Sequence, residues 1–459
     1  MEIHTTIAAI STPLAPGGIG IVRISGPEAV AVADRIFRSP KGKILAQRPT
    51  HTLTYGEIID PVNGETVDEC LVSVMRAPHT YTGEDICEIN CHGGLYVCDR
   101  VLRLCLENGA AMAQPGEFTK RAFLNGKMDL SRAEAVIDLI SAESGAANRV
   151  AVGQLKGQMG RKIQALRDRI IRVCADILVA VEYPDEDAPP IQEHKTYITI
   201  CEIRDEISKL YNSFEAGRAI KEGIQTVIVG KPNVGKSSIL NVLAGFDRAI
   251  VTNIAGTTRD VLQERIRLGG VMLNLHDTAG IRHADDEVER IGVERSLELI
   301  DQGELIFFVV DISRPLDEND EAIMEHLDPA RTIVLFNKND LQTTVDEARI
   351  LAQFPHTVYL SALRNTGVDE LERMVREMFL QQAQGLQQGE IVTNARQRDC
   401  LRRACDDVAS AVDGLDMGYP FDLVTINLQD AVDDLGQITG QTASEAIISD
   451  IFSRFCLGK

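Results

Sequence analysis

The chain has 459 residues, of which 44% are hydrophobic and 25% are charged. These values are ordinary for a globular protein, and the length suits about three domains of roughly 150 residues. The net charge of −21 argues against a general affinity for nucleic-acid backbone, which depends on cations, so an RNA partner would need a locally basic surface. No apolar run reaches 18 residues and no basic segment precedes an apolar core at the N-terminus, so we expect no membrane span and a cytoplasmic protein.

Residues 1–127 combine strand-like runs with turn signals and predict a compact α+β domain. The segment 16–26 predicts a loop that feeds a strand, and 28–37 predicts a helix. Polar and apolar residues alternate over 85–91, which is typical of a half-buried strand, and an apolar helix follows through Leu106.

The ten cysteines lie mostly inside apolar segments, which is typical of reduced thiols. Cys87, Cys91, His92 and Cys98 could suggest a metal site. However, Cys87 and Cys91 share the apolar face of the predicted strand, and no second Cys-x-x-Cys pair follows. We therefore favour core packing over metal binding for this group.

A helical pattern begins at Ser131, where Ser131-Arg-Ala-Glu134 matches a capping box ahead of a 3.6-residue apolar rhythm. It continues to about Val181, and an acidic, proline-rich loop follows at 183–190. Because helices also lie on both sides of 221–380, we predict one helical domain interrupted by an insertion. The further helices are expected at 195–216, 395–411 and 443–455.

The stretch Arg161–Arg172 is the candidate for a locally basic surface that could meet RNA. Its simpler interpretation, which we favour, is a solvated helix face.

A phosphate-binding loop, Gly230-Lys-Pro-Asn-Val-Gly-Lys-Ser237, matches G-x-x-x-x-G-K-[ST] without substitution. The β-branched run Thr226–Val229 before it predicts a buried strand. The segment Ser237–Ala244 behind it predicts a helix closed by Gly245. Backbone N–H groups and the helix dipole favour phosphate at such a junction.

Three later segments identify the nucleotide. Asp277 ends a predicted strand at 273–276 and begins Asp-Thr-Ala-Gly280, where a carboxylate suits water-mediated Mg²⁺ binding. Asn337-Lys-Asn-Asp340 follows a strand at 333–336, and its carboxylate can accept two donors that guanine has and adenine lacks. Ser361-Ala362 can offer N–H to guanine O6. Residues 221–380 thus resemble the translation-factor-related GTPases, with Thr258 placed to join Ser237 on Mg²⁺.

Ras-like GTPases commonly orient the attacking water with a Gln that follows the Asp-x-x-Gly motif, but Ile281 stands there. Another polar group must serve, and Asn233 could help to hold a monovalent cation in place of an arginine finger. The nearby candidates for the water are Arg282, His283, Glu287 and Glu289.

The whole chain resembles the MnmE (TrmE) family of bacterial tRNA modification GTPases. The resemblance implies a multidomain α/β fold: an N-terminal α+β folate-binding-like domain (1–127), an all-α helical domain (128–220 and 381–459) and an inserted Ras-like doubly wound α/β G domain (221–380). Two positions depart mildly from the family pattern, Leu457 in the tail and Asn253 in the switch segment. The resemblance is carried by 18–23, 81–85, 92–94, 115–127, the nucleotide motifs and the tail 455–459.

The resemblance also implies site residues. Lys236, Glu289 and Cys456 would be catalytic, with Glu289 positioning the water and Cys456 acting as a functional thiol. K⁺ would bind Asn233, Thr252, Ile254 and Thr257. A tetrahydrofolate derivative (5-formyl or 5,10-methylene) would bind Arg23, Glu88, Lys127 and Lys459. GTP would bind Asn233, Val234, Gly235, Lys236, Ser237, Ser238, Thr252, Asn253, Ile254, Ala255, Gly256, Thr257, Thr258, Asp277, Thr278, Ala279, Gly280, Asn337, Lys338, Asp340, Ser361, Ala362 and Leu363.

The function implied is a K⁺-stimulated GTPase that forms a homodimer and a heterotetramer with a flavin-dependent partner, MnmG (GidA). Together they would add an aminomethyl or carboxymethylaminomethyl group to C5 of the wobble uridine (position 34) of certain tRNAs. The alternative is a ribosome-assembly GTPase that binds RNA without modification chemistry. Such switches carry an RNA-binding module such as a KH domain, whereas acidic helices follow the nucleotide domain here.

Overall fold

The computed structural model describes residues 5–182, 192–246, 264–275 and 300–459. The chain forms two compact units. The first unit contains 1–137, 155–167 and 433–459, and the second contains 138–154 and 168–432. Within the described residues, no helix has the length and apolar character needed to cross a membrane.

The first unit is built on a seven-stranded sheet of order β3-β4-β5-β6-β2-β1-β7, in which only β1 and β7 pair in parallel. Successive side chains of β1 point to opposite faces of the sheet and pack into two different apolar clusters. Ala8 packs into the core beneath α1 and α2, whereas Ile7 and Ala9 contact Phe118 of α3 on the other face. The elements of this part are β1 (Ile7–Ile10), β2 (Gly17–Ser25), α1 (Ala29–Arg35), β3 (Phe37–Arg38), η1 (Leu45–Gln47), β4 (Thr52–Ile59), β5 (Thr66–Met75), β6 (Ile86–Gly93), α2 (Leu95–Glu107), β7 (Ala111–Met112) and α3 (Glu117–Leu124).

The C-terminal tail docks within this first unit. Helix α17 (Glu445–Ser453) contributes Phe452 to an apolar cluster with Phe455 and Leu130. Beyond it, Ser11 Oγ donates to Gly458 O over 3.1 Å, and Phe118 N donates to Lys459 O over 3.2 Å. The last residues of the chain are therefore held against β1 and the start of α3.

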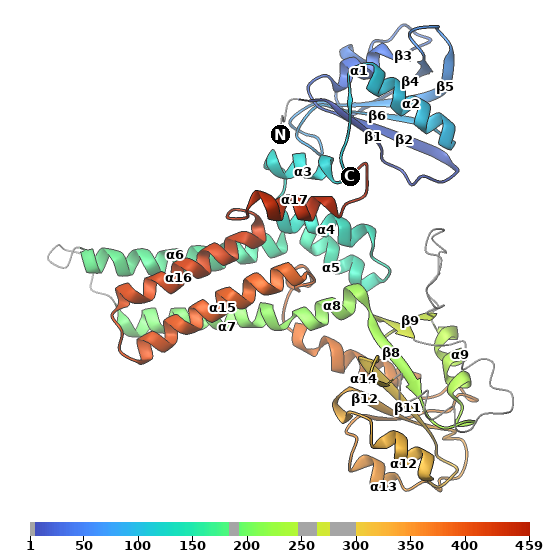
Figure 1. The fold of residues 1–459 in the computed structure, drawn as a ribbon, viewed down its shortest axis with the longest axis vertical. Helices are drawn as coiled ribbons and strands as arrows, with labels where there is room; N and C mark the ends of the chain where they lie inside the picture. The colour runs from blue at the N-terminus through green and yellow to red at the C-terminus, as the bar shows by residue number, and fades with distance from the viewer. Residues whose placement is uncertain (1–4, 183–191, 247–263, 276–299) are drawn as a thin grey trace. The chain divides into compact units, whose positions relative to one another are not determined.

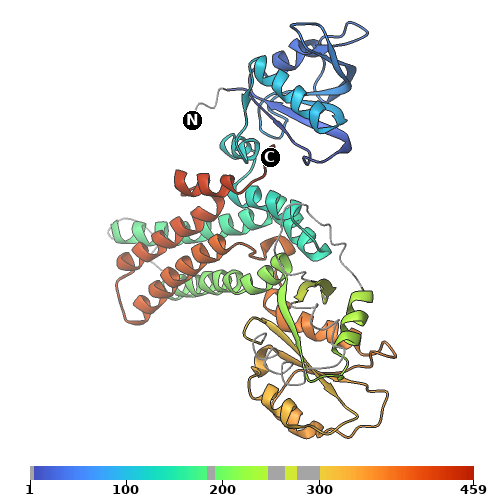
Figure 2. The same cartoon turned by 45° about the vertical axis from the view of Figure 1, so that its right-hand side comes forward.

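Helices follow in both units: α4 (Leu130–Ile140), α5 (Gly145–Leu155), α6 (Gln158–Glu182), α7 (Glu193–Asn212), α8 (Phe214–Glu222), α15 (Ala395–Asp416) and α16 (Phe421–Thr439). Helices α7 and α15 lie on either side of the nucleotide domain in sequence, yet they run side by side (Figures 1 and 2). An insertion into one helical domain requires this arrangement.

Two details of the predicted helices were wrong. Ser131 lies inside α4, and its hydroxyl donates to Asp129 Oδ1. The same carboxylate accepts from Arg132 N over 2.9 Å, so Asp129, which directly precedes α4, acts as the cap. The predicted helix 28–37 ends at Arg35, because Phe37 and Arg38 pair with β4 as β3.

The described residues of the nucleotide domain form a six-stranded sheet of order β13-β12-β11-β8-β10-β9, in which β9 is antiparallel to β10 and the other neighbours are parallel. Side chains of its central strands alternate between two cores, one beneath α9 and α14 and the other beneath α12 and α13. This two-sided layering is the doubly wound α/β fold. Its elements are β8 (Ile224–Val229), α9 (Lys236–Phe246), β9 (Glu264–Leu268), β10 (Val271–Leu275), β11 (Leu305–Asp311), α12 (Glu318–Met324), β12 (Thr332–Asn337), α13 (Glu347–Leu351), β13 (Thr357–Tyr359) and α14 (Val368–Leu380).

Candidate functional site

The loop Gly230–Ser237 joins β8 to α9, as the sequence predicts. Gly235 has φ 100°, and a Cβ there would lie 2.2 Å from Asn337 Nδ2. At Gly230, with φ 143°, a Cβ would lie 2.5 Å from Val309 O. Both positions therefore require glycine. The predicted end of this helix at Gly245 was wrong, since α9 continues to Phe246.

Lys236 folds back over this loop. Its Nζ donates to Gly230 O over 2.6 Å and to Lys231 O over 2.8 Å. Burial lowers the pKa of Lys236 to about 8, because an apolar environment disfavours the charged form. The ammonium thus lies inside the phosphate loop, where its donors could transfer from backbone carbonyls to phosphate oxygens. Ser237 lies in the first turn of α9 beside it.

Asn337, at the end of β12, joins the phosphate loop to the predicted base-recognition segment, Asn337–Asp340. The side chain of Asn337 donates to Val234 O over 2.8 Å and accepts from Ala362 N over 3.3 Å. A buried amide therefore joins the phosphate loop to the segment after β13. This junction fixes three of the predicted GTP-binding segments relative to one another.

Lys338 makes a second connection. It adopts a left-handed backbone conformation with φ 63°, and its Nζ donates to Asn233 O over 3.1 Å. The same Nζ lies 2.6 Å from Asp311 Oδ2. Asp340 accepts from Ser361 Oγ over 2.5 Å, and this hydrogen bond lowers the pKa of Asp340. Ala362 is half-buried and Leu363 is exposed.

Some predicted residues lie outside the described part of the chain. They are Thr252, Asn253, Ile254, Ala255, Gly256, Thr257, Thr258, Asp277, Thr278, Ala279, Gly280 and Glu289, together with the other candidates for positioning water. Of the expected K⁺ ligands the structure describes Asn233, which is exposed, and of the two expected Mg²⁺ ligands it describes Ser237.

The sequence interpretation missed Asp311. This residue ends β11, opposite Asn337 in the parallel register, and its side chain is 1% exposed. Ser313 donates to Asp311 Oδ1 from its hydroxyl over 2.7 Å and from its N–H over 3.0 Å. Burial would raise the pKa of Asp311, but hydrogen bonds from Lys338 and Ser313 outweigh it, and the pKa is lowered. An acidic residue after the apolar run 305–310 was the available signal.

Lys231 is the second residue that was missed. Its Nζ lies 2.8 Å from Asp317 Oδ2 and 2.6 Å from Asp320 Oδ2. These two aspartates form the capping box of α12. The first turn of the phosphate loop is thereby anchored to a helix more than eighty residues away in sequence.

The expected folate residues lie in the first unit, and two of them touch. Arg23 and Glu88 face each other across β2 and β6, and Arg23 Nε lies 2.8 Å from Glu88 Oε1. The guanidinium also lies over the rings of Phe118, at 5.6 Å, and Tyr81, at 5.8 Å. Phe118 N donates to Lys459 O over 3.2 Å, so the backbone of Lys459 lies next to the backbone of Phe118.

Lys127 and Cys456 form hydrogen bonds with other parts of the first unit. Lys127 Nζ donates to Pro78 O over 2.9 Å. Cys456 is exposed, and its carbonyl accepts from Gly116 N over 3.5 Å. The structure thus brings Arg23 and Glu88 together, and it brings the backbone of Lys459 to the backbone of Phe118.

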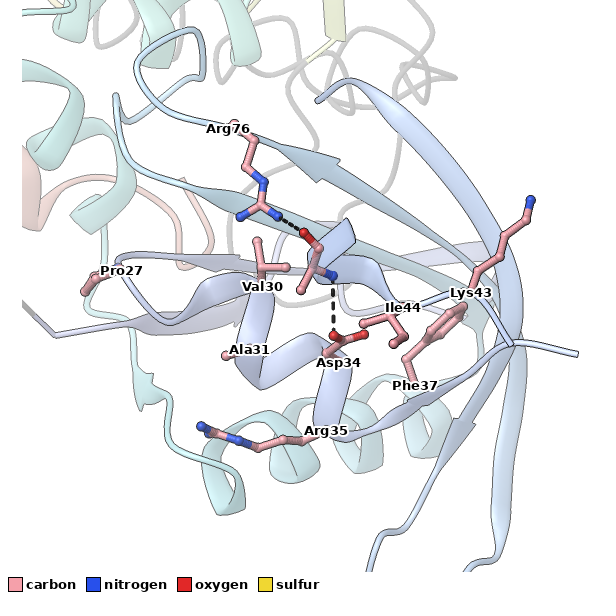
Figure 3. Close-up of a pocket in the computed structure, with 10 residues that line it drawn as sticks. Pro27, Val30, Ala31, Asp34, Arg35, Phe37, Lys43, Ile44 and Arg76 are labelled. Atoms are coloured by element: carbon pink, nitrogen blue, oxygen red, sulfur yellow. Dashed lines mark hydrogen bonds between the residues drawn. The ribbon is translucent and has the colours of Figure 1, made fainter. Parts of the chain in front are cut away.

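A separate cavity of about 650 Å³ opens beside α1 (Figure 3). Two hydrogen bonds fix the backbone of Ala46 at the edge of this cavity. Asp34 accepts from Ala46 N, and Arg76 donates to Ala46 O. None of the expected folate residues lines it. It is lined by Pro27, Val30, Ala31, Asp34, Arg35, Phe37, Lys43, Ile44, Ala46 and Arg76.

The thiols near β6 lie in the core of the first unit. Cys87 and Cys91 of β6 and Cys98 of α2 are buried in one core cluster, and Cys91 Sγ lies 3.9 Å from Cys98 Sγ. Burial raises the pKa of Cys87 and Cys91 to about 12. His92 is exposed instead, and its Nδ1 lies 2.7 Å from Asp68 Oδ1. No group of three metal-binding side chains occurs in the described ranges.

Comparisons with known proteins extend over the whole chain. Residues 130–456 match the family model for the MnmE helical domain, and residues 6–127 match the model for the N-terminus of the GTP-binding protein TrmE. Proteins named tRNA modification GTPase MnmE are 45% identical in Acetivibrio thermocellus, 47% in Geobacillus kaustophilus and 46% in Clostridioides difficile. Each alignment covers 100% of this chain and 100% of the relative. The chain therefore belongs to the MnmE family of tRNA modification GTPases.

Proposed function

We propose that this protein is a K⁺-stimulated GTPase that works with a flavin-dependent partner, MnmG, on C5 of the wobble uridine of certain tRNAs. Membership of the family makes it a GTP hydrolase of tRNA modification. The cation, the partner and the uridine chemistry are the finer part of the proposal, and they rest on the resemblance of the sequence.

The observation that carries the nucleotide assignment is the junction at Asn337. One buried amide binds Val234 O of the phosphate loop and Ala362 N of the segment after β13. Lys338 adds a bond to Asn233 O from the residue next in sequence. A nucleotide that spans from phosphates to base needs both ends at a fixed separation. The contacts of Asn337 and Lys338 support the proposal, because they tie the two ends of such a site to each other.

The residues present suit Mg²⁺ and K⁺. Ser237 would hold Mg²⁺ with Thr258, and Asn233 would hold K⁺ with Thr252, Ile254 and Thr257. These ions would neutralise the charge that develops on the phosphates during transfer. The fit is supported by Lys236, whose ammonium donates to the carbonyls of Gly230 and Lys231, so the backbone of this loop accommodates a positive charge.

The protein's own groups have separate roles in this proposal. Lys236 would move its donors from backbone carbonyls to the phosphates. Asp340 would accept from the guanine edge, and Ser361 holds its carboxylate in place. Glu289 would position the attacking water. Hydrolysis would then drive a domain motion instead of supplying a leaving group to the uridine.

In the first unit we propose a tetrahydrofolate site at Arg23, Glu88, Lys127 and Lys459. A glutamate can accept from the pterin edge, and cations can meet the anionic tail of the cofactor. The pair of Arg23 and Glu88 supports this, because it places both kinds of group beside the aromatic rings of Tyr81 and Phe118. Bound folate would supply the one-carbon unit. We also propose that the protein forms a homodimer.

Two measurements test the proposal. GTP turnover by the full chain should be faster in K⁺ than in Na⁺ at equal ionic strength, and equal rates would reject the cation. Mass spectrometry of tRNA from a deletion strain should show unmodified wobble uridines that return on complementation. Wobble uridines that remain modified in the deletion strain would support an assembly factor instead.

A further inference from the structure

The segment 155–167 stands out within an acidic chain. It carries Lys156, Arg161, Lys162 and Arg167 and no carboxylate, whereas the chain as a whole has a net charge of −21. Arg167 is buried and hydrogen-bonded to Gln164 and Gln441. Lys156 and Arg161 are exposed instead, at the junction of α5 and α6.

The fold of the first unit adds Arg132 of α4 to these cations. Arg132 Nε donates to Leu155 O over 2.9 Å, and Arg132 Nη1 donates to Lys127 O over 3.1 Å. Arg161 Nη1 donates to Lys156 O over 2.8 Å. A Cβ at Gly157 would lie 3.4 Å from Arg161 Nη1 and 4.0 Å from Arg132 Nε. The two guanidinium groups therefore both lie close to Gly157.

These three side chains, Arg132, Lys156 and Arg161, form what we call the α4–α6 cation cluster. In the described part of the chain, none of them forms an ion pair with a carboxylate. Asp129 lies close by, because its Oδ1 accepts from Arg132 N and its Oδ2 would lie 2.4 Å from a Cβ at Gly160. One carboxylate among three cations leaves the surface positively charged.

The positive charges of Arg132 and Arg161 repel each other. Backbone carbonyls hold the two guanidinium groups in place but do not neutralise their charge. Such an arrangement lowers the ordering cost of binding an anion that presents several charges in a row. A phosphodiester backbone is an anion of this kind, and its binding is dominated by cationic contacts.

We propose that the α4–α6 cation cluster contacts the phosphodiester backbone of the tRNA. The proposal rests on the function proposed above, in which tRNA is the substrate, and it names where an otherwise acidic protein meets it. Contacts of this type position the RNA and carry no sequence information.

The test is tRNA binding by the full-length protein, measured by filter binding with an unmodified tRNA transcript over a series of salt concentrations. The variant is Lys156→Glu with Arg161→Glu. We expect its tRNA affinity to fall about tenfold near 0.1 M salt, and the slope of log K against log salt to shrink by about one for each lost contact. GTP hydrolysis and the melting temperature should stay unchanged.

Lys43→Glu is the matched control, since Lys43 is exposed on the cavity beside α1 and the substitution changes charge in the same way. We expect it to bind tRNA as the wild type does. If charge reversal lowers the melting temperature, Lys156→Gln with Arg161→Gln replaces it, with a smaller loss expected.

Wild-type affinity and slope in the double variant would overturn this proposal alone, as would an equal loss in Lys43→Glu. A wild-type protein that binds no tRNA would also overturn this proposal, whereas wobble uridines that remain modified in the deletion strain would overturn the proposed function with it. Binding to phosphatidylglycerol vesicles is measured for the same proteins. If the double variant loses vesicle binding but keeps its tRNA affinity, the cluster belongs to a membrane-facing surface and the proposal is overturned.

Discussion

Asp311 Oδ2 and Lys338 Nζ lie 2.6 Å apart, and the same ammonium donates to Asn233 O of the phosphate loop. The carboxylate is almost fully buried, whereas Lys338 is 31% exposed. One ion pair therefore connects the end of β11, the base-recognition segment and the phosphate loop. Asp311 acts through Lys338, so we treat it as a positioning residue.

Asp311→Asn should keep the shape of the side chain and remove its charge. We expect GDP affinity to fall roughly tenfold, because hydrogen bonds to charged groups contribute about 1.5–3 kcal/mol. KM for GTP should rise while kcat at saturation is kept, which a loss of folded protein would not produce. Arg314→Gln is the control, because Arg314 is 65% exposed and its Nε lies 3.8 Å from the same carboxylate. Wild-type GDP affinity in Asp311→Asn would contradict this role.

Lys236 should make nucleotide binding depend on pH. Its pKa is about 8 in the free protein, and bound phosphates would raise it. Below pH 8 the ammonium is protonated in both states, but above pH 8 binding must take up a proton. GDP affinity should therefore fall about tenfold between pH 7 and pH 9, and calorimetry in buffers of different ionisation enthalpy should detect the proton. Lys236→Met should bind weakly at every pH. If the GDP affinity of the wild type does not change between pH 7 and pH 9, this role of Lys236 is disproved.

Gly235→Ala should disrupt base recognition. Its φ of 100° is unfavourable for alanine, and the new Cβ would lie 2.2 Å from Asn337 Nδ2. Because Asn337 must move, its bonds to Val234 and Ala362 would break, and we expect at least a hundredfold loss of GTP affinity. Gly245→Ala in α9 is the control, since nothing lies within 4 Å of that position. There helix propensity predicts a gain of up to about 1 kcal/mol in the free energy of unfolding.

Glu289→Ala should slow GTP hydrolysis by roughly 10²-fold, the lower range for a positioned acid or base. Nucleotide affinity should be kept, because water positioning acts after binding. Single-turnover hydrolysis and GDP titration measure the two effects separately. Glu287→Ala changes the same charge two residues earlier and should hydrolyse GTP normally. A normal rate in Glu289→Ala would move the water-positioning role to another residue.

Local patterns were enough to predict the phosphate loop, because strand, glycine-rich turn and helix follow one another within 226–244. They also predicted β12, which is a short apolar run next to a polar motif. The helix α16 was missed although its signal was present. Its buried residues recur at spacings of four and three, namely Val424, Leu428, Ala431, Leu435 and Ile438.

The partners of Asp311 and Lys231 could not be predicted in the same way. Lys231 meets Asp317 and Asp320 only because β8 and the start of α12 reach one edge of the sheet. No spacing within the sequence encodes such a contact. The pairing of Arg23 with Glu88 is similar, since it depends on the register of β2 against β6. The resemblance of the sequence named both residues, and the fold supplied their relationship.

The pair of Arg23 and Glu88 allows a structural role to be separated from folate binding. The two side chains are 17% and 23% exposed. Loss of either one should lower the free energy of unfolding by about 1–3 kcal/mol. Exchanging them, with Arg23→Glu and Glu88→Arg together, should restore much of that stability because the ion pair can form again.

Folate should respond differently, because a ligand recognises which group stands at which position. We expect 5-formyltetrahydrofolate to bind the wild type and to be lost from both single variants and from the exchanged pair, as measured by calorimetry. Arg38→Gln is the control, since Arg38 forms a similar cross-strand pair with Glu57 on β3 and β4. If the exchanged protein regains both stability and folate affinity, then Arg23 and Glu88 only support the sheet, and the ligand must be held by other residues.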